Sequence, residues 1–189
     1  SLALPFLVFW CLAPGIAWWI SRPIDSSSPG LSGSQQRFLR RLSRKTWHFF
    51  ETFVTAQEHW LPPDNVQEVP GPTIATRTSP TNMGLALLAN LAARDFGYIS
   101  TGTLIQRTRD TLATLHGLER HRGHFYNWYD TRTLQPLLPV YVSSVDSGNL
   151  AGHLLTLGAG LREQMDEPLY TPELFRGIGD TLAVLQELL

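Results

Sequence analysis

The expected helices of this chain are joined by connections that alternate between long and short, and this alternation limits the possible folds more than any other feature. Apolar residues at helical spacing predict helices over about residues 35–57, 79–96, 101–118 and 147–164, and another from about residue 171. Long irregular segments follow the first and third of these helices, and short ones follow the second and fourth. Helical hairpins whose long loops gather at one end form an α/α toroid with its active site at that end. A plain helical bundle is the alternative, but it would not need loops of this length.

Local signals support this division into helices and loops. Ser79 and Pro80 are typical of an N-cap followed by the first residue of a helix. Several prolines within residues 59–78 exclude a regular helix from the first long connection. The chain is therefore expected to be mostly α-helical, with little strand beyond a short hairpin near Tyr126 and Val140.

The chain begins with an apolar run. Residues 2–20 carry no charge and approach the roughly 20 residues that a bilayer-spanning helix needs. Trp18 and Trp19, followed by Arg22, match an interfacial aromatic belt with a flanking positive charge. A signal peptide is disfavoured, because no basic region precedes the run and no small-residue cleavage site follows it; a buried soluble helix remains the alternative. The expected parts are a transmembrane segment at 1–21, a linker rich in serine, glycine and proline at 22–34, and a soluble part from 35 to 189 on the cytoplasmic side.

Charge and cysteine content exclude several classes of protein. With 15 basic and 16 acidic residues the net charge is -1, whereas a protein whose main partner is nucleic acid usually has a basic face. The single cysteine, Cys11, excludes an intrachain disulfide framework and a cysteine-cluster metal site. His116, His121 and His124 do not make a metal site either, because no acidic residue lies at ligand spacing.

The second long connection carries the main candidate binding residues. It reads GHFYNWYDTRTLQPLLPVYVSSVDSGN over residues 123–149, with several aromatic rings and two aspartates. Loops of this composition often carry function. Aromatic faces beside amides and carboxylates suit sugars, whose C–H faces stack on rings while their hydroxyl groups are held at the edges. The alternative is a folded hairpin whose rings only build the core.

Three stretches of the chain resemble the cyclic β-1,2-glucan synthases. They are RTSPTNMGLALLANLAARDFGYIS at residues 77–100, FYNWYDTRTLQPLLPVYVSSVDSGNLAGHLLTL at 125–157, and LPPDNVQE at 61–68. The resemblance covers nearly the whole chain, and the motifs are long and unusual. It places the chain where the last membrane segment of such a synthase joins its central, glucoamylase-like domain.

The resemblance implies a fold and an activity. Residues 35–189 would form the N-terminal part of an all-α, (α/α)6-barrel domain, truncated at its C-terminal end and preceded by the transmembrane helix. Such a domain closes linear β-1,2-glucan into a ring by transglycosylation, in an enzyme of the bacterial inner membrane whose other domains lie on the same polypeptide. The implied partners are β-1,2-glucan and, through residues 2–20, the membrane; no cofactor is expected in this part of the chain. The main catalytic carboxylates of the family lie further along its polypeptide.

Two aspartates stand out as candidates for the site. Asp146 lies at the start of an expected helix, where it either faces a ligand, as a catalytic or binding group, or caps the helix. Asp130 follows Trp128 and Tyr129, where it either binds a sugar hydroxyl or forms a turn. Two carboxylates are the usual equipment of a glycosidase, with a separation that the sequence does not give.

The remaining candidates are polar or aromatic side chains of the long loops and of the helix starts beside them. Arg77 either clamps sugar hydroxyls or forms a structural ion pair. The predicted substrate-binding residues are Arg77, Asn82, His124, Asn127, Trp128, Tyr129, Asp130, Ser144 and Ser147. Because alternating hairpins bring long loops to the same end, we expect Arg77, Asn82, Trp128, Asp130 and Asp146 to line one open cleft there.

Overall fold

The computed structural model describes residues 3–22 and 30–187. Contacts between Cα atoms divide the chain into two units, Ser1–Gly33 and Ser34–Leu189. Each is held by its own internal contacts.

The first unit contains helix α1 (Leu4–Ile20). Its 17 residues correspond to about 26 Å at about 1.5 Å per residue, whereas the hydrocarbon core of a bilayer is about 30 Å thick. Pro14 lies inside this helix. Within residues 3–22 and 30–187, no helix combines the length and the apolar character needed to cross a membrane. The prediction of a transmembrane helix over residues 2–20 is therefore wrong.

The second unit is an array of helices with small sheets at one end. Its α-helices are α2 (Gly33–Phe53), α3 (Pro80–Asp95), α4 (Thr101–Gly117), α5 (Ser144–Met165) and α6 (Pro172–Gln186). A short 3-10 helix, η1 (Ala56–Glu58), follows α2. The strands are β1 (Val66–Gln67), β2 (Thr73–Ile74), β3 (Arg77–Thr78), β4 (Arg120–His121), β5 (His124–Phe125), β6 (Asn127–Asp130) and β7 (Pro136–Tyr141).

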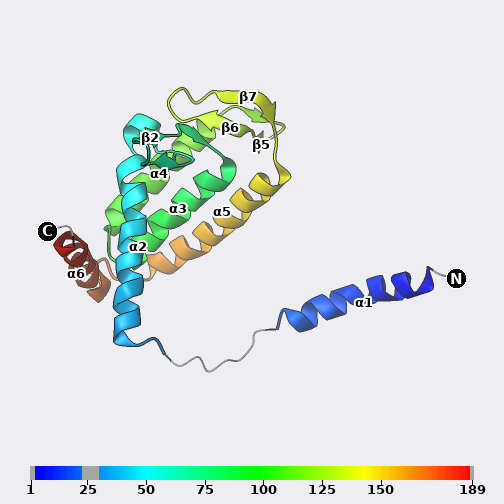
Figure 1. The fold of residues 1–189 in the computed structure, drawn as a ribbon, viewed down its shortest axis with the longest axis horizontal. Coiled ribbons are helices and arrows are strands. Elements are labelled where there is room, and N and C mark those ends of the chain that lie inside the picture. The colour runs from blue at the N-terminus through cyan, green and yellow to red at the C-terminus, as the bar shows by residue number, and fades with distance from the viewer. Residues whose placement is uncertain (1–2, 23–29, 188–189) are drawn as a thin grey trace. The chain divides into compact units, whose positions relative to one another are not determined.

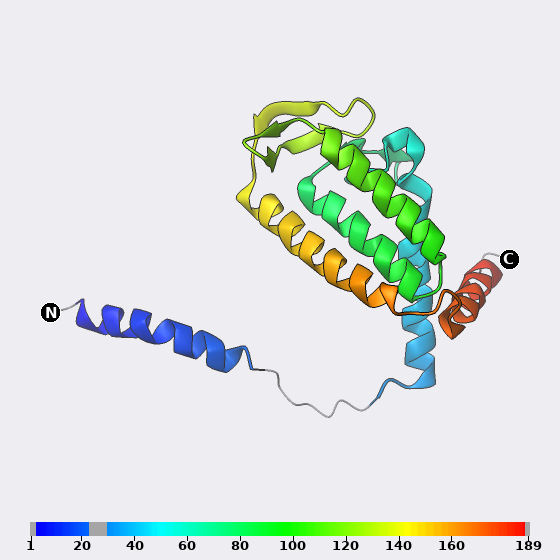
Figure 2. The same ribbon diagram turned by 180° about the vertical axis from the view of Figure 1, so that it is seen from behind.

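The two long connections meet at one end of the helices. Helix α3 packs between α4 and α5, and the strands lie beyond the first turns of α3 and α5 (Figures 1 and 2). Thr131, from the second long connection, donates its hydroxyl proton to Glu58 and its amide proton to the carbonyl of Thr76, both in the first connection. We name the part of the molecule formed by these two connections, residues 54–79 and 118–143, the loop end. It corresponds to the end at which the alternating hairpins were expected to gather their loops.

Serine side chains fix the starts of the central helices. The hydroxyl groups of Ser79, Ser100 and Ser143 each accept a hydrogen bond from a backbone amide three residues later, as N-caps do. The cap at Ser143 starts α5 at Ser144, three residues before the predicted start. Helix α2 ends at Phe53 rather than near residue 57, because η1 interrupts it.

Among the described residues, the largest sheet has three strands, in the order β3–β6–β7. Strands β6 and β7 pair antiparallel, with Asn127 opposite Tyr141. This pairing corresponds to the hairpin expected near Tyr126 and Val140. The sheet lies at the loop end and does not form a separate layer alongside the helices (Figure 1).

The core beneath this sheet joins the helices to the loops. Leu61, Met83, Leu115, Leu118 and Tyr129 form one buried cluster. These residues come from both long connections as well as from α3 and α4. The position of the loop end is therefore set by burial of apolar surface, which is the main favourable contribution to folding.

Small residues allow α3 and α5 to approach closely. A Cβ atom on Gly84 of α3 would lie 2.3 Å from Nδ1 of His153, and one on Gly160 of α5 would lie 2.3 Å from Cδ2 of Leu91. Both separations are far shorter than a normal contact. Gly84 and Gly160 therefore allow the close approach of these two helices.

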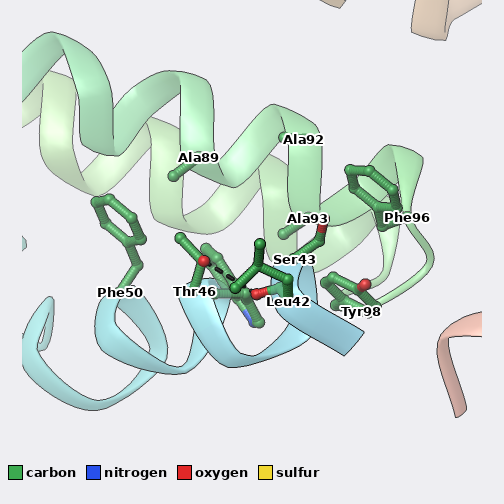
Figure 3. A pocket seen from close by; sticks show the side chains of 10 residues that line it. Leu42, Ser43, Thr46, Phe50, Ala89, Ala92, Ala93, Phe96 and Tyr98 are labelled. Atoms are coloured by element: carbon green, nitrogen blue, oxygen red, sulfur yellow. Dashed lines mark hydrogen bonds between the residues drawn. The ribbon is translucent and has the colours of Figure 1, made fainter. Parts of the chain in front are cut away.

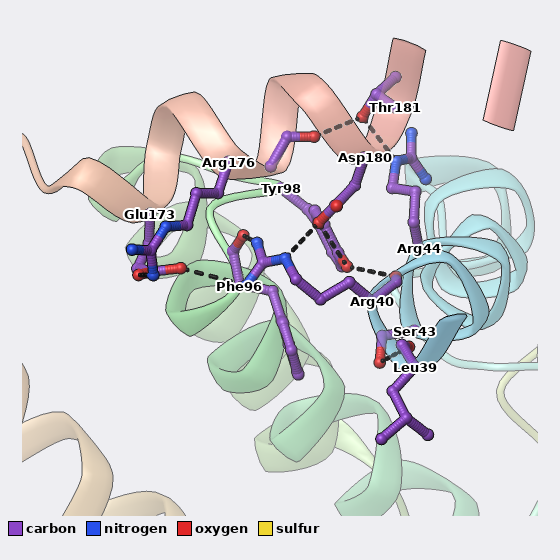
Figure 4. A network of polar contacts seen from close by, with 11 residues as sticks. Leu39, Arg40, Ser43, Arg44, Phe96, Tyr98, Glu173, Arg176, Asp180 and Thr181 are labelled. Atoms are coloured by element: carbon purple, nitrogen blue, oxygen red, sulfur yellow. Dashed lines mark hydrogen bonds and ion pairs between the residues drawn. The ribbon is translucent and has the colours of Figure 1, made fainter. Parts of the chain in front are cut away.

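Polar contacts join helix α6 to α2, as Figure 4 shows. Nε of Arg40 lies 2.8 Å from Oδ2 of Asp180, and its Nη1 lies 3.1 Å from Oε2 of Glu173. Arg44 donates to the hydroxyl of Thr181, and the hydroxyl of Tyr98 donates to the carbonyl of Arg40. The turn between α3 and α4 is thereby connected to both helices.

Candidate functional site

Strand β6 directs alternate side chains to opposite faces. Asn127 and Tyr129 are buried, whereas Trp128 and Asp130 are partly exposed, as the two-residue period of a strand requires. Arg77 of β3 lies directly opposite Asp130 and therefore shares its outward face. The predicted site residues of this segment are thus divided between the core and the surface.

Arg77 connects the outward face of β6 to the loop that precedes β1. Its guanidinium lies 5.1 Å from the centre of the Trp128 ring, within the range of a cation–π interaction. Its Nε and Nη2 atoms lie 3.1 and 2.9 Å from Oδ2 of Asp64. The other carboxylate oxygen of Asp64 accepts a long, 3.4 Å bond from Nδ2 of Asn82, in the first turn of α3. We call Asp64, Arg77, Asn82 and Trp128 the Asp64 cluster.

Asp146 is the centre of a second group of contacts. Its Oδ1 accepts the hydroxyl proton of Thr81 at 2.7 Å, and its Oδ2 accepts a proton from Nδ2 of Asn127 at 3.0 Å. Nδ2 of Asn149 donates to the same Thr81 hydroxyl at 3.1 Å. The carboxylate of Asp146 thus links the starts of α3 and α5 to β6.

These contacts determine the protonation of Asp146. Burial raises the pKa of its carboxyl, but hydrogen bonds from Thr81, Ser143, Asn127 and Ser79 outweigh burial and lower the pKa below its ordinary value. Hydrogen bonds to a carboxylate favour its charged form. At neutral pH, Asp146 is therefore an ionised hydrogen-bond acceptor and lacks the proton that a general acid must give.

Asp130 serves its own turn. Its Oδ1 accepts hydrogen bonds from the backbone amides of Arg132 and Thr133, at 2.9 and 2.7 Å. Burial raises the pKa of Asp130, but these amide bonds outweigh it and the net direction is downward. This geometry matches the turn-forming alternative for Asp130, and it gives no sign of a two-carboxylate pair with Asp146.

The other predicted residues have different surroundings. Tyr129 is fully buried, and its hydroxyl donates to the carbonyl of Glu119 at 2.6 Å, as a core tyrosine does. His124 and Ser144 are exposed, on β5 and in the first turn of α5. Oδ1 of Asn127 and Oγ of Ser147 are buried and have no hydrogen-bond partner.

The Asp64 cluster and the contacts of Asp146 lie at the same end of the helices. Thr81, which binds Asp146, and Asn82, which binds Asp64, are neighbours in the first turn of α3. Arg77 and Asp146 are therefore not at opposite ends of the array. That the predicted residues line a single open cleft stays a prediction, as do their roles in binding and catalysis.

Asp64 and Thr81 were missed as site residues from the sequence. Both lie within the motifs that carry the family resemblance, LPPDNVQE and RTSPTNMG. Asp64 directly follows two buried prolines, which is a local signal for a fixed loop. The contacts of these residues connect segments distant in the chain, which residue spacing alone does not reveal.

Metal ligands do not gather at this site. Within the part of the chain that the structure describes, no group of three or more histidine, cysteine, aspartate or glutamate residues is placed to hold a metal ion. The carboxylates of Asp64, Asp130 and Asp146 instead accept hydrogen bonds from groups of this chain.

A cavity of about 300 Å³ lies away from the loop end, between α2 and α3 (Figure 3). Its uncharged lining includes Leu42, Phe50, Ala89, Ala93 and Phe96. Three hydroxyl groups at its wall are already engaged, since Ser43, Thr46 and Tyr98 donate to backbone carbonyls of α2. These three hydroxyl groups are therefore already used within the chain.

The fold of this chain is similar to part of that of two glucoamylase-like proteins and fits an α/α-barrel-like arrangement. A glucoamylase-like protein of Bacteroides fragilis NCTC 9343 superposes with a TM-score of 0.54 and 20% identity, over 87% of this chain and 38% of that one. A second one, from Bacteroides caccae ATCC 43185, gives a TM-score of 0.53 and 21% identity, over 63% of this chain and 30% of that one. These structures support the barrel-like part of the predicted fold.

The sequence comparison is more specific. The chain is 44% identical over its full length to the cyclic β-(1,2)-glucan synthase NdvB of Rhizobium meliloti (strain 1021), and it spans 7% of the length of that protein. No family model matches the chain. The chain is therefore a homologue of a segment of cyclic β-1,2-glucan synthase, which confirms the family resemblance carried by its motifs.

Proposed function

We propose that this chain forms a glucan-binding part of a cyclic β-1,2-glucan synthase, within the domain that closes linear β-1,2-glucan into a ring by transglycosylation. One observation carries the proposal: the outward face of β6 presents a partly exposed indole, Trp128, beside the guanidinium of Arg77, which shares the carboxylate of Asp64 with Asn82. An aromatic face bordered by hydrogen-bonding groups matches the two sides of a glucose ring. The likeness to the Rhizobium synthase supports the choice of glucan.

In this proposal Trp128 stacks a glucose unit, while Arg77 and Asn82 hold its hydroxyl groups. Asp146 keeps the first turns of α3 and α5 in place through Thr81 and Asn127. Its lowered pKa and its internal hydrogen bonds favour this supporting role over that of the reacting acid. The groups that break and form the glycosidic bond would then be supplied elsewhere in the synthase.

A purely carbohydrate-binding module is the second candidate. The observation that favours it is the absence of a free carboxylate pair among Asp64, Asp130 and Asp146, each of which is bound to groups of this chain. Both candidates require the same glucan-binding surface, and they differ in whether transglycosylation depends on it. The location of the synthase at the bacterial inner membrane stays a prediction.

The proposal is tested by titrating linear β-1,2-linked glucooligosaccharides into the 189-residue chain in a calorimeter. Trp128→Ala should raise the Kd about five- to tenfold, because one aromatic contact contributes about 1 kcal/mol. Phe175→Ala is the matched control, since this ring is 73% exposed on α6 and lies outside the loop end. Absence of binding by the unaltered chain, or equal Kd values for both variants, would refute the binding site.

Trp128→Ala in the synthase that carries this segment separates the two candidates. If the segment takes part in ring closure, the variant should form less cyclic glucan while its melting temperature stays close to that of the unaltered enzyme. A binding module that acts apart from ring closure would lose affinity for glucan at unchanged cyclisation.

A further inference from the structure

The ion pair between Asp64 and Arg77 lies where it can fix the orientation of the Trp128 ring. Both Nε and Nη2 of Arg77 point to one carboxylate oxygen, Oδ2 of Asp64. The carboxylate is only 19% exposed, whereas the arginine side chain is half exposed. The buried partner is thus the fixed one, and it holds an arginine that would otherwise move freely in solvent.

The backbone around Asp64 is itself fixed. Its amide donates to the carbonyl of Ala75 at 3.1 Å, and the amide of Ala75 donates to the carbonyl of Asn65 at 3.0 Å. These bonds close the base of the β1–β2 hairpin. Asp64 therefore starts from a defined backbone position, which a group that orients another side chain requires.

Arg77 transmits this position to Trp128. The guanidinium lies 5.1 Å from the indole centre, and the β3–β6 register places both side chains on the outward face of the sheet. Arginine stacks well on an indole because its guanidinium is planar and weakly hydrated. The side chain of Asn82 is held by the same carboxylate.

We propose that Asp64 is a positioning residue for glucan binding, which orders Trp128 through Arg77 and presets Asn82 before the sugar arrives. The inference rests on the proposed function of this site. Groups already held in their bound arrangement lose less conformational entropy on binding. Loss of Asp64 should therefore weaken glucan binding although the carboxylate itself need not touch the sugar.

A merely structural ion pair is the competing explanation, and the chain offers a matched control. Glu58 and Arg132 also lie at the loop end, with Nε of Arg132 3.0 Å from Oε1 of Glu58. Their exposures, 16% for the carboxylate and 62% for the arginine, resemble those of the Asp64 pair. In both pairs the carboxylate also binds a second polar side chain, Thr131 in one and Asn82 in the other. Among the residues that the structure describes, however, no aromatic ring is a partner of Arg132.

The test is a double-mutant cycle in the 189-residue chain, with Asp64→Asn, Arg77→Lys and both together. Calorimetric titration with linear β-1,2-linked glucooligosaccharides should show each single variant raising the Kd roughly two- to fivefold, the range expected for a partly exposed ion pair. The double variant should bind no more weakly than the weaker single variant, because both changes break the same connection. Glu58→Gln and Arg132→Lys should leave the Kd unchanged.

A ligand-free measurement separates failure of this inference from failure of the proposed function. With 5-fluorotryptophan incorporated, the fluorine signal of Trp128 is assigned by its loss in Trp128→Phe. Asp64→Asn should shift or broaden that signal, and Glu58→Gln should not. If the chain binds no glucan but the signal responds in this way, the proposed function fails and the ordering of Trp128 stands. If the signal or the Kd responds equally to both carboxylate variants, or to neither, the positioning role is refuted.

Discussion

Arg107 shows how much structure one side chain can hold. Its Nη2 donates to the carbonyls of Phe50 and Val54 at the end of α2, at 2.9 and 3.2 Å. The last carbonyls of a helix lack the amide partners of its interior; the Phe50 carbonyl still accepts the amide of Val54, and Arg107 adds a further bond to it. The guanidinium also lies near two indoles, 5.2 Å from the centre of the Trp47 ring and 5.5 Å from that of Trp60. Burial lowers the pKa of Arg107 more than Glu51 raises it.

Replacing Arg107 with lysine should be costly although it preserves the charge. Lysine lacks the planar fork that bonds two carbonyls and stacks on rings, so we expect the free energy of unfolding to fall by about 2 kcal/mol. Urea denaturation followed by circular dichroism measures it. Arg109→Lys, at an exposed position two residues away, should change it by less than about 0.5 kcal/mol, and an equal effect of both would contradict the capping role.

Asp146 makes the stability of the chain sensitive to acid. Its pKa is lowered below the ordinary value of 3.8 by hydrogen bonds that outweigh the effect of burial. Its contribution to stability is therefore present above that ordinary value and is lost as the pH falls through the folded-state pKa. Asp146→Asn should remove this part of the acid sensitivity and lower stability at pH 7 by about 1–3 kcal/mol.

Denaturation curves measured from pH 7 down to pH 3 check this expectation. Asp166→Asn, an exposed aspartate just after α5, is the control and should leave the acid limb unchanged. If the free energy of unfolding falls with pH in parallel for the unaltered chain and for Asp146→Asn, the carboxylate is not held by these hydrogen bonds.

At the scale of elements, α6 depends on the polar network around Tyr98. The Tyr98 hydroxyl donates to the carbonyl of Arg40 at 2.9 Å and lies 3.4 Å from Oδ2 of Asp180. Burial and the charge of Asp180 raise its pKa to about 12, with Arg40 opposing them. The hydroxyl of Tyr98 is therefore one titratable group that connects three parts of the chain. These are the turn between α3 and α4, helix α2 and helix α6 (Figure 4).

This arrangement predicts a loss of stability at high pH. Below the ordinary value of 10.0, Tyr98 is protonated in both states and its contribution is complete. Between pH 10 and about 12 the unfolded chain releases the proton while the folded chain keeps it, so stability falls. The difference in free energy of unfolding between the unaltered chain and Tyr98→Phe should shrink across this window. Tyr141→Phe, at an exposed position on β7, should follow the unaltered curve.

The sequence predicted helix starts better than it predicted how side chains are divided between core and surface at the loop end. Ser79 and Pro80 located the start of α3 because capping depends on adjacent residues. The division of β6 into buried Tyr129 and outward Trp128 was not predicted, because the hairpin expected near Tyr126 did not specify which of its residues face the core. Asp64 escaped notice because its partners come from other elements, and only the fold brings them together.

At the scale of the whole molecule, the chain consists of two units with separate internal contacts. The buried core residues lie in the second unit, between Trp47 and Leu157. Helix α1 has no buried residue. Folding of residues 34–189 should therefore not require the first unit.

A chain that lacks residues 1–33 should unfold with an unchanged melting temperature. Differential scanning calorimetry of both forms checks this. As a control, removal of residues 172–189 should lower the melting temperature, because it takes away the partners of Arg40 and Arg44 on α6. A lower melting temperature after the first deletion would mean that α1 supports the second unit.

The alternation along β6 has a consequence for how this segment can evolve. Substitutions at Trp128 or Asp130 alter the outward surface, while Asn127 and Tyr129 continue to fill the interior. Insertion or deletion of a single codon would exchange the two sets, exposing the core tyrosine and burying the arginine-stacked indole. Related genes should therefore differ in the residues of this segment and keep its length. New ligand specificities would then arise by point mutation, with the spacing of the segment unchanged.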